Sequence, residues 1–163
     1  MEGYNRPMAH VHSYRADLAW EGSTGIGYDR FGRAHRLGAP PADTTLELSA
    51  DAAFRGDSAL LNPEQLLLAA AASCQLLSFL AVAARARIDV VAYRDTAEAV
   101  MPEDQRPIRI ARITLHPVIT LGPGSVEVSE ARLAHLVEVA HRECFIANSL
   151  SSDIEVRPAF VRP

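Results

Sequence analysis

The sequence predicts an α+β fold in a single domain of 163 residues. Three observations lead to this prediction. Apolar and polar residues alternate in the first third of the chain and again after residue 89, which is typical of strands. Between these regions, residues 66–84 form an uncharged run of helical length, and residues 129–144 carry an apolar stripe at spacings of three and four. The predicted order is three strands, a long helix, two strands, a helix and a last strand.

The first third of the chain is predicted to form an antiparallel meander. Its strands are expected within residues 11–21, 27–37 and 44–49. The turn signal Glu21-Gly22-Ser23-Thr24-Gly25 separates the first two strands, and Ala39-Pro40-Pro41 breaks the chain before the third. We expect residues 1–12 to be a loosely ordered N-terminal segment of the same domain.

A long helix is predicted to begin at Asn62-Pro63-Glu64, which supplies an N-cap, a proline at the first helical position and a first-turn carboxylate. It can run to about Arg87. Its uncharged stretch, residues 66–84, is long enough to span a bilayer. Four side chains with polar or thiol groups interrupt that stretch: Ser73, Cys74, Gln75 and Ser78. We therefore expect a helix wrapped on all sides, at the centre of a domain or a dimer.

The second half of the chain is predicted to add three strands and a second helix. The strands are expected over residues 89–101, 109–121 and 154–157. Ser129 is the expected cap of the helix, which ends between residues 148 and 153. Its apolar stripe consists of Leu133, Leu136, Val137, Ala140 and Cys144. The sequence thus predicts that Cys144 faces inward.

Composition excludes several classes of function. A formal net charge of −4 and a pI near 5.8 argue against a nucleic-acid-binding protein, which needs a basic face. The N-terminus has no apolar segment of the kind that a secretory signal needs. Two cysteines are too few for a disulfide scaffold, so the expected location is a reducing cytoplasm. The six histidines form no zinc-binding motif with each other or with the cysteines, and we expect no metal and no bound cofactor.

Cys74 and Cys144 are the only cysteines, and each lies in an uncharged helical context. Thiolate chemistry is one of the few activities that a small domain performs without metal or cofactor. A cysteine is also a small apolar residue that is often simply buried. The residues alone therefore leave both redox chemistry and packing open.

The run Asn62-Pro63-Glu64-Gln65-Leu66-Leu67 is followed by Cys74 ten residues after its glutamate. The second cysteine lies on a later helix and is followed by Asn148-Ser149-Leu150. In these motifs, and in element order from about Tyr14 onward, the chain resembles the OsmC/Ohr family of thiol peroxidases. The resemblance implies an intertwined OsmC-like fold, in which antiparallel sheets surround a long central helix that carries the first cysteine.

The resemblance also implies roles for both cysteines. Cys74 takes the place of the peroxidatic thiolate, which an organic hydroperoxide oxidises to a sulfenic acid. Cys144 takes the place of the resolving thiol, which forms an intramolecular disulfide with Cys74. An external thiol or dithiol reductant, such as a lipoyl or other dithiol protein, then reopens the disulfide. Because the residues around Cys74 are uncharged, we expect an alkyl or acyl hydroperoxide to suit the site better than hydrogen peroxide.

A glutamate and an arginine complete the implied site. Glu64 takes the family's glutamate position, and Arg30, in the run Arg30-Phe31-Gly32-Arg33, takes that of the arginine that favours the thiolate. Arg33 and Arg36 are rivals for this role. Glu64 and Cys74 are about 15 Å apart along a helix axis and about 280° around it, so they cannot touch in one straight helix. Either the helix breaks, or the Arg–Glu pair serves Cys74 of another chain, as in the family's intertwined homodimers.

The chain departs from the family at the residue after the second cysteine, which is often proline there and is Phe145 here. Phe145 keeps a backbone amide that proline lacks. The resemblance thus implies a homodimeric organic hydroperoxide reductase, and we expect no nucleic-acid or membrane partner. The alternative is a non-enzymatic stress or ligand-binding protein, whose apolar interface pocket holds a lipid-like molecule.

Overall fold

A computed structural model describes residues 10–162 of the chain and has the α+β architecture that the sequence predicts. The chain divides into two compact units, one ending at Pro63 and the other beginning at Glu64, and each is described by itself. That the two form one domain over residues 1–163 stays a prediction. The loosely ordered segment expected over residues 1–12 lies, for its first nine residues, outside the described part of the chain.

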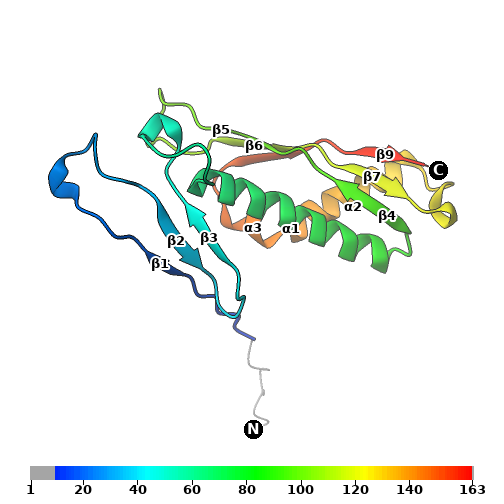
Figure 1. The fold of residues 1–163 in the computed structure, drawn as a ribbon. Helices are drawn as coiled ribbons and strands as arrows, with labels where there is room; N and C mark the ends of the chain where they lie inside the picture. Colours follow the sequence, from blue (N-terminus) through cyan, green and yellow to red (C-terminus); the bar gives the residue numbers. More distant parts are fainter. Residues whose placement is uncertain (1–9, 163) are drawn as a thin grey trace, which may run out of the picture. The chain divides into compact units, whose positions relative to one another are not determined.

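The N-terminal unit contains the predicted antiparallel meander (Figure 1). Its strands are β1 (Asp17–Ala19), β2 (His35–Gly38) and β3 (Thr45–Leu48). All three are shorter than predicted, and β2 begins only at His35 because residues 24–34 form a 3-10 turn and a loop. Gly27, the C-cap of the 3-10 turn, has a φ of 97°, a backbone conformation that a strand does not adopt. Arg33 then donates to the main-chain oxygens of Tyr28 and Phe31, and these bonds hold the loop in place of a ladder.

The C-terminal unit combines three helices with two three-stranded sheets. Its elements are α1 (Pro63–Arg85), β4 (Val90–Arg94), β5 (Glu98–Val100), β6 (Arg112–Leu115), β7 (Val118–Leu121), α2 (Glu130–Glu143), α3 (Phe145–Ser149), β8 (Asp153–Val156) and β9 (Ala159–Val161). The sheet orders are β4-β7-β9 and β5-β6-β8. Both are mixed rather than wholly antiparallel, because β8 and β9 return through α2 and α3 to run parallel to β6 and β7.

Two predicted strands each become two. The strand predicted over residues 109–121 is interrupted at His116 and Pro117, since proline has no N–H to give to a ladder. The strand predicted over residues 89–101 is interrupted near Asp95, whose carboxylate accepts a 2.7 Å hydrogen bond from the N–H of His116. The chain therefore passes from one sheet to the other at both places, and the Asp95 carboxylate ties the two passages together.

The main core joins α1, α2 and β7. It contains Phe79 and Val82 from α1, Leu133 and Ala140 from α2, and Ile119 from β7. Every residue of the predicted stripe on α2 is buried, which confirms that Cys144 faces inward with 1% of its surface exposed. Figure 1 shows α1 and α2 on the same side of the strands. A smaller core around Ala71, Ile113 and Leu115 lies at the start of α1.

The helix α1 is only partly covered within this chain. In the described part of the chain, α1 alone is long and apolar enough to cross a membrane. Only 28% of the 18-residue apolar window that meets this test is buried inside the structure. A single such helix is weak evidence for a membrane span, because the core helix of a soluble protein passes the same test. Leu77 is 63% exposed and Leu80 is 37% exposed. The expectation of a helix wrapped on all sides therefore does not hold within one chain.

Candidate active site

Cys74 lies in the middle of α1, on the face that lines a groove. The groove has a volume of about 800 Å³. Ser78, Ala81 and Arg85 follow Cys74 at spacings of four, seven and eleven residues, which puts them on the same side of the helix. The groove is lined by Ala70, Ser73, Cys74, Leu77, Ser78, Ala81, Arg85, Arg142, Glu143, Phe145, Ile146 and Asn148. Most of the lining near the thiol is apolar, as the uncharged run of α1 predicts.

Cys144 lies at the break between α2 and α3. The sequence predicted one helix through this region, whereas the structure places an extended residue here, with φ −73° and ψ 109°. Cys144 caps both helices. Its N–H donates to the oxygen of His141 at the end of α2, and its Sγ accepts from the N–H of Ala147, at 3.4 Å, at the start of α3. The break turns the chain so that the thiol and the first N–H groups of α3 face α1.

The two thiols meet between α1 and the α2–α3 break. Both are free, Cys74 is half-buried and Cys144 is buried. Cys144 is hydrogen-bonded to Cys74. The N–H of Ile146 also donates to the Cys74 Sγ at 3.5 Å. The fold therefore brings together two cysteines that are seventy positions apart in the sequence.

The surroundings separate the two thiols in acidity. Burial alone would raise the pKa of Cys74, but hydrogen bonds from the Cys144 thiol, the N–H groups of Ile146 and Phe145, and the Ser78 hydroxyl together lower it. Burial raises the pKa of Cys144 to about 11, and the hydrogen bond and charge of Cys74 act in the same direction. Cys74 is thus the thiol that ionises first, whereas Cys144 stays protonated and donates a hydrogen bond to Cys74.

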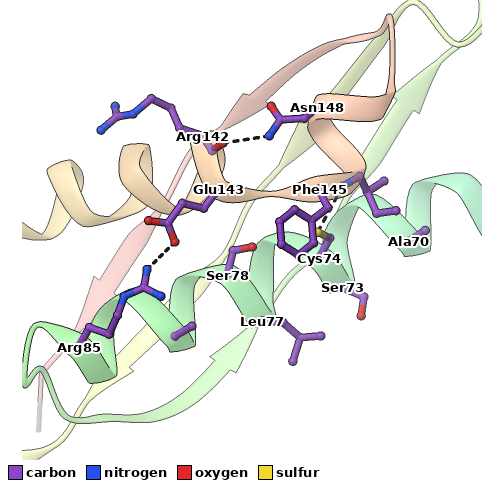
Figure 2. Close-up of a pocket in the computed structure, with 12 residues that line it drawn as sticks. Ala70, Ser73, Cys74, Leu77, Ser78, Arg85, Arg142, Glu143, Phe145 and Asn148 are labelled. Atoms are coloured by element: carbon purple, nitrogen blue, oxygen red, sulfur yellow. Dashed lines mark hydrogen bonds and ion pairs between the residues drawn. The ribbon is translucent and has the colours of Figure 1, made fainter. Parts of the chain in front are cut away.

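Charged residues lie at the far end of the groove from Cys74. Arg85, at the last turn of α1, pairs with Glu143, the last residue of α2 (Figure 2). The Arg142 side chain points away from the thiol in the same view, while its main-chain oxygen accepts a bond from Asn148. Phe145 is 80% exposed, and its ring lies beside Cys74 on the groove. The thiol end of the groove is therefore apolar and the far end is charged.

Glu64 is not brought to Cys74 within one chain. α1 runs without a break from Pro63 to Arg85, so Glu64 stays in the first turn, about 15 Å along the axis from Cys74. Of the two possibilities that the sequence left open, a broken helix is wrong. That an Arg–Glu pair from another chain acts on Cys74 stays a prediction.

The three candidate arginines differ in their local partners within the N-terminal unit. Arg36 pairs with Glu47 across β2 and β3. Arg33 uses both terminal nitrogens on loop carbonyls and lies over the ring of Phe31. Arg30 donates its Nε to the oxygen of Ile26 at 2.6 Å, and we find no contact of its terminal nitrogens among the described residues of this unit. Those nitrogens are the ones that could serve a thiolate, which favours Arg30 over its two rivals. Its position relative to Cys74 stays a prediction.

Sequence reasoning missed two contributors to the site. Ser78 could have been found, because it lies four residues after Cys74 and so on the same helix face. The N–H of Ile146 carries no sequence signal of its own, because its direction depends on the break at Cys144. Within residues 10–162 no group of three or more His, Cys, Asp or Glu side chains could hold a metal ion.

Comparisons with known proteins agree with this fold. The profile of the family described as OsmC-like protein matches residues 56–158. No match to a curated protein sequence is found. An OsmC-like protein of unknown function from Vibrio cholerae is 23% identical, with a TM-score of 0.82 over 91% of this chain and 100% of that one.

Two other solved structures carry names that refer to organic hydroperoxide resistance. An organic hydroperoxide resistance protein OsmC from Legionella pneumophila is 19% identical, with a TM-score of 0.69 over 93% of this chain and 98% of that one. A putative organic hydroperoxide resistance protein from Vibrio cholerae, with captopril bound in one of its active sites, is 22% identical. Its TM-score is 0.65 over 96% of each chain. At these identities the structures show a shared fold, and with the profile match over more than half of the sequence they place this chain in the OsmC-like protein family.

Proposed function

We propose that this protein reduces organic hydroperoxides to alcohols by cysteine chemistry. The observation that carries the proposal is the contact between Cys74 and Cys144, beside an apolar groove of about 800 Å³. The Cys74 thiol is half-buried and its pKa is lowered, whereas the Cys144 thiol is buried and its pKa is raised. A structural cysteine pair has no need of this difference.

The proposed cycle has three steps. The Cys74 thiolate attacks the outer oxygen of the hydroperoxide; the O–O bond breaks, the sulfur is oxidised to a sulfenic acid, and the alkoxide leaves as an alcohol after taking a proton. Cys144, as a thiolate, attacks the Cys74 sulfur; an S–S bond forms, the S–O bond breaks, and water leaves with the proton that Cys144 gave up. An external dithiol then reduces the disulfide to two thiols and becomes a disulfide itself.

The groove supports an apolar substrate. Leu77, Phe145 and Ile146 offer apolar surface next to Cys74. Burial of apolar surface contributes about 25 cal/mol per Å² to binding. This favours an alkyl or acyl hydroperoxide over hydrogen peroxide, which has no apolar surface to bury. The names of the Legionella and Vibrio structures, which refer to organic hydroperoxide resistance, agree with this class of substrate.

A second copy of the chain is proposed to complete the site. Glu64 cannot reach Cys74 along an unbroken α1, and the exposed Leu77 and Leu80 leave an apolar side of that helix uncovered. A homodimer that covers α1 answers both points, with the Arg30–Glu64 pair serving the Cys74 of the partner. We further propose that the protein works in a reducing cytoplasm, with a thiol or dithiol reductant such as a lipoyl protein.

The test follows consumption of an alkyl hydroperoxide with a dithiol as reductant. Sustained turnover by the unmodified protein is expected, with Cys74→Ser inactive and Cys144→Ser forming one sulfenic acid per chain without sustained turnover. Consumption of the hydroperoxide by Cys74→Ser at the full rate would overturn the proposal.

A second candidate is a non-enzymatic protein that holds a lipid-like ligand. The observation that favours it is the groove, whose volume lies within the range of small-molecule sites. Tight binding of a fatty acid by a protein that does not react with hydroperoxide would support this candidate. Oxidation of Cys74 by one equivalent of alkyl hydroperoxide would support the enzyme.

A further inference from the structure

We propose that the C-terminal unit holds an internal water-binding site, in which a buried water molecule joins the side chains of Gln75, Tyr93 and Asp95. The site goes beyond the proposed function and does not rest on it, because none of these three residues lines the groove. It lies between the two apolar clusters that form the core of this unit.

The site begins with a polar residue on the buried side of α1. The buried residues of this helix are Ala71, Gln75, Phe79, Val82 and Ala83, and Gln75 is their only polar member. Gln75 is 1% exposed, and its Oε1 has no hydrogen-bond partner among the described residues. A buried amide oxygen without a partner is costly, so most such groups in folded proteins bond to the protein or to water.

Tyr93 and Asp95 supply two further polar atoms from the strand side. Burial alternates from residue 93 to residue 97, with Tyr93, Asp95 and Ala97 half-buried and the residues between them exposed. The Asp95 Oδ1 accepts the N–H of His116, whereas its Oδ2 and the Tyr93 hydroxyl are buried and have no partner in the described part of the chain. Burial, followed by the negative charge of Asp95, raises the pKa of Tyr93, which agrees with a hydroxyl near that carboxylate.

The two apolar clusters show how this stretch of strand lies along α1. In the larger cluster, the rings of Phe79 and Tyr93 contact each other with their centroids 6.2 Å apart. In the smaller cluster, Ala97 packs against the group that contains Ala71. Residues 93–97 therefore run in the opposite direction to α1, from the end of the helix at β4 toward its start at β5 (Figure 1).

Gln75 and Asp95 are the midpoints of these two paired segments. Gln75 lies four residues, or about 6 Å of helix, from Ala71 and from Phe79. Asp95 lies two residues, or about 7 Å of strand, from Tyr93 and from Ala97. Because the two spacings match, the Gln75 amide is placed opposite the Asp95 carboxylate.

A water molecule matches the hydrogen-bonding capacity of the three unpartnered atoms. The Gln75 Oε1 and the Asp95 Oδ2 only accept, whereas the Tyr93 hydroxyl can donate once. The hydroxyl alone therefore leaves one acceptor without a donor. A water that accepts from Tyr93 donates to both oxygens, and three hydrogen bonds are typical of a buried water. Since Gln75 follows Cys74 directly, the site also holds α1 at the residue next to the thiol.

The first measurement is a crystal structure of the unsubstituted protein, at a resolution that shows ordered water. The expected result is a buried water within hydrogen-bond distance of all three side chains. Direct hydrogen bonds between the side chains that leave no room for a water, or side chains turned away from one another, would overturn the inference.

The second measurement tests whether the side chains act together, by denaturant titration of full-length variants under reducing conditions. Tyr93→Phe and Gln75→Leu each leave the remaining polar atoms short of a partner, and each should raise the unfolding equilibrium constant about tenfold. The double variant should change this constant by less than the product of the two single effects, because the first substitution already breaks the shared network. Single effects that multiply in the double variant would count against a shared water and overturn the inference.

Tyr28→Phe is the matched control, because it removes a hydroxyl from a ring that is 64% exposed. Its unfolding equilibrium constant should stay within about twofold of that of the unsubstituted protein. A control as destabilised as Tyr93→Phe would remove the support that the titration gives. If a variant does not fold, the crystal structure of the unsubstituted protein decides by itself.

Discussion

Closure of the disulfide is predicted to speed up steeply with pH. The attacking thiol, Cys144, is 1% exposed, and burial is the main cause that raises its pKa to about 11. Only the thiolate is nucleophilic, and its population grows about tenfold per pH unit below the pKa. Oxidation of Cys74 to a neutral sulfenic acid removes the contribution of that residue to the raised pKa, but burial remains. The attack therefore stays limited by the ionisation of Cys144.

The size of the effect follows from the raised pKa. With a pKa of about 11, the thiolate fraction of Cys144 is roughly 10⁻⁴ at pH 7 and roughly 10⁻² at pH 9. The closure rate should then rise about 100-fold between these pH values. Loss of the Cys74 contribution raises the absolute rate at each pH and leaves the slope unchanged while the pKa stays above the working range.

The assay oxidises the reduced protein with one equivalent of an alkyl hydroperoxide and stops the reaction with acid at set times. Mass analysis then separates the sulfenic acid from the disulfide. Cys144→Ser is the control and should show the sulfenic acid without closure at any pH. A closure rate that does not change from pH 7 to pH 9 would refute the reasoning. It would mean that the ionisation of Cys144 does not limit the attack.

Four further outcomes are expected. Ser78→Ala should slow alkylation of Cys74 at neutral pH about threefold, because a donor to the thiolate is lost; an unchanged rate would exclude this role. Leu77→Glu should give a chain of 17.7 kDa by light scattering if α1 lies in a dimer interface, where a buried unpaired charge is costly; an unchanged dimer would exclude that face. Phe79→Ala should lower the free energy of unfolding by about 3–5 kcal/mol, since Phe79 is fully buried; denaturant titration measures this, and a loss below 1 kcal/mol would contradict the core described above. Under excess hydroperoxide, Cys144→Ser should oxidise its Cys74 sulfenic acid further to sulfinic acid faster than the unsubstituted protein does, as detected by mass, because no resolving thiol competes with further oxidation; equal rates of sulfinic acid formation in the two proteins would argue against resolution by Cys144.

Periodicity and capping predicted the helices well because both depend on local sequence. The start of α1 at Pro63 and the inward stripe of α2 match the structure for this reason. The break at Cys144 was missed, because the residues on both sides continue a helical pattern. The thiol itself caps α3, and that contact exists only once the chain has turned. The paths of β5 and β6 were missed because Asp95 meets the N–H of His116 across 21 positions of sequence.

The candidate site was predictable in its thiols but not in their acidity. The spacing from Glu64 and the uncharged contexts pointed to Cys74 and Cys144, and the fold brings these two together. Which of them ionises first depends on burial, on the hydrogen bond between the two thiols and on main-chain N–H groups, and no residue type signals these. The one available cue was the absence of proline after Cys144, because it leaves an N–H at Phe145.

Two independent features suggest that one chain does not hold the whole site. The first is a distance: about 15 Å of unbroken helix separates Glu64 from Cys74, and no side-chain rotamer spans it. The second is surface: Leu77 and Phe145, both next to the thiol, are 63% and 80% exposed. A thiolate beside open apolar residues would meet water as readily as substrate, and water weakens each hydrogen bond that holds the charge. In the dimer that we propose, a second chain over this surface would exclude water from the thiolate, and the Arg30–Glu64 pair of that chain is proposed to serve it, so the dimer belongs to the proposed chemistry and not only to stability.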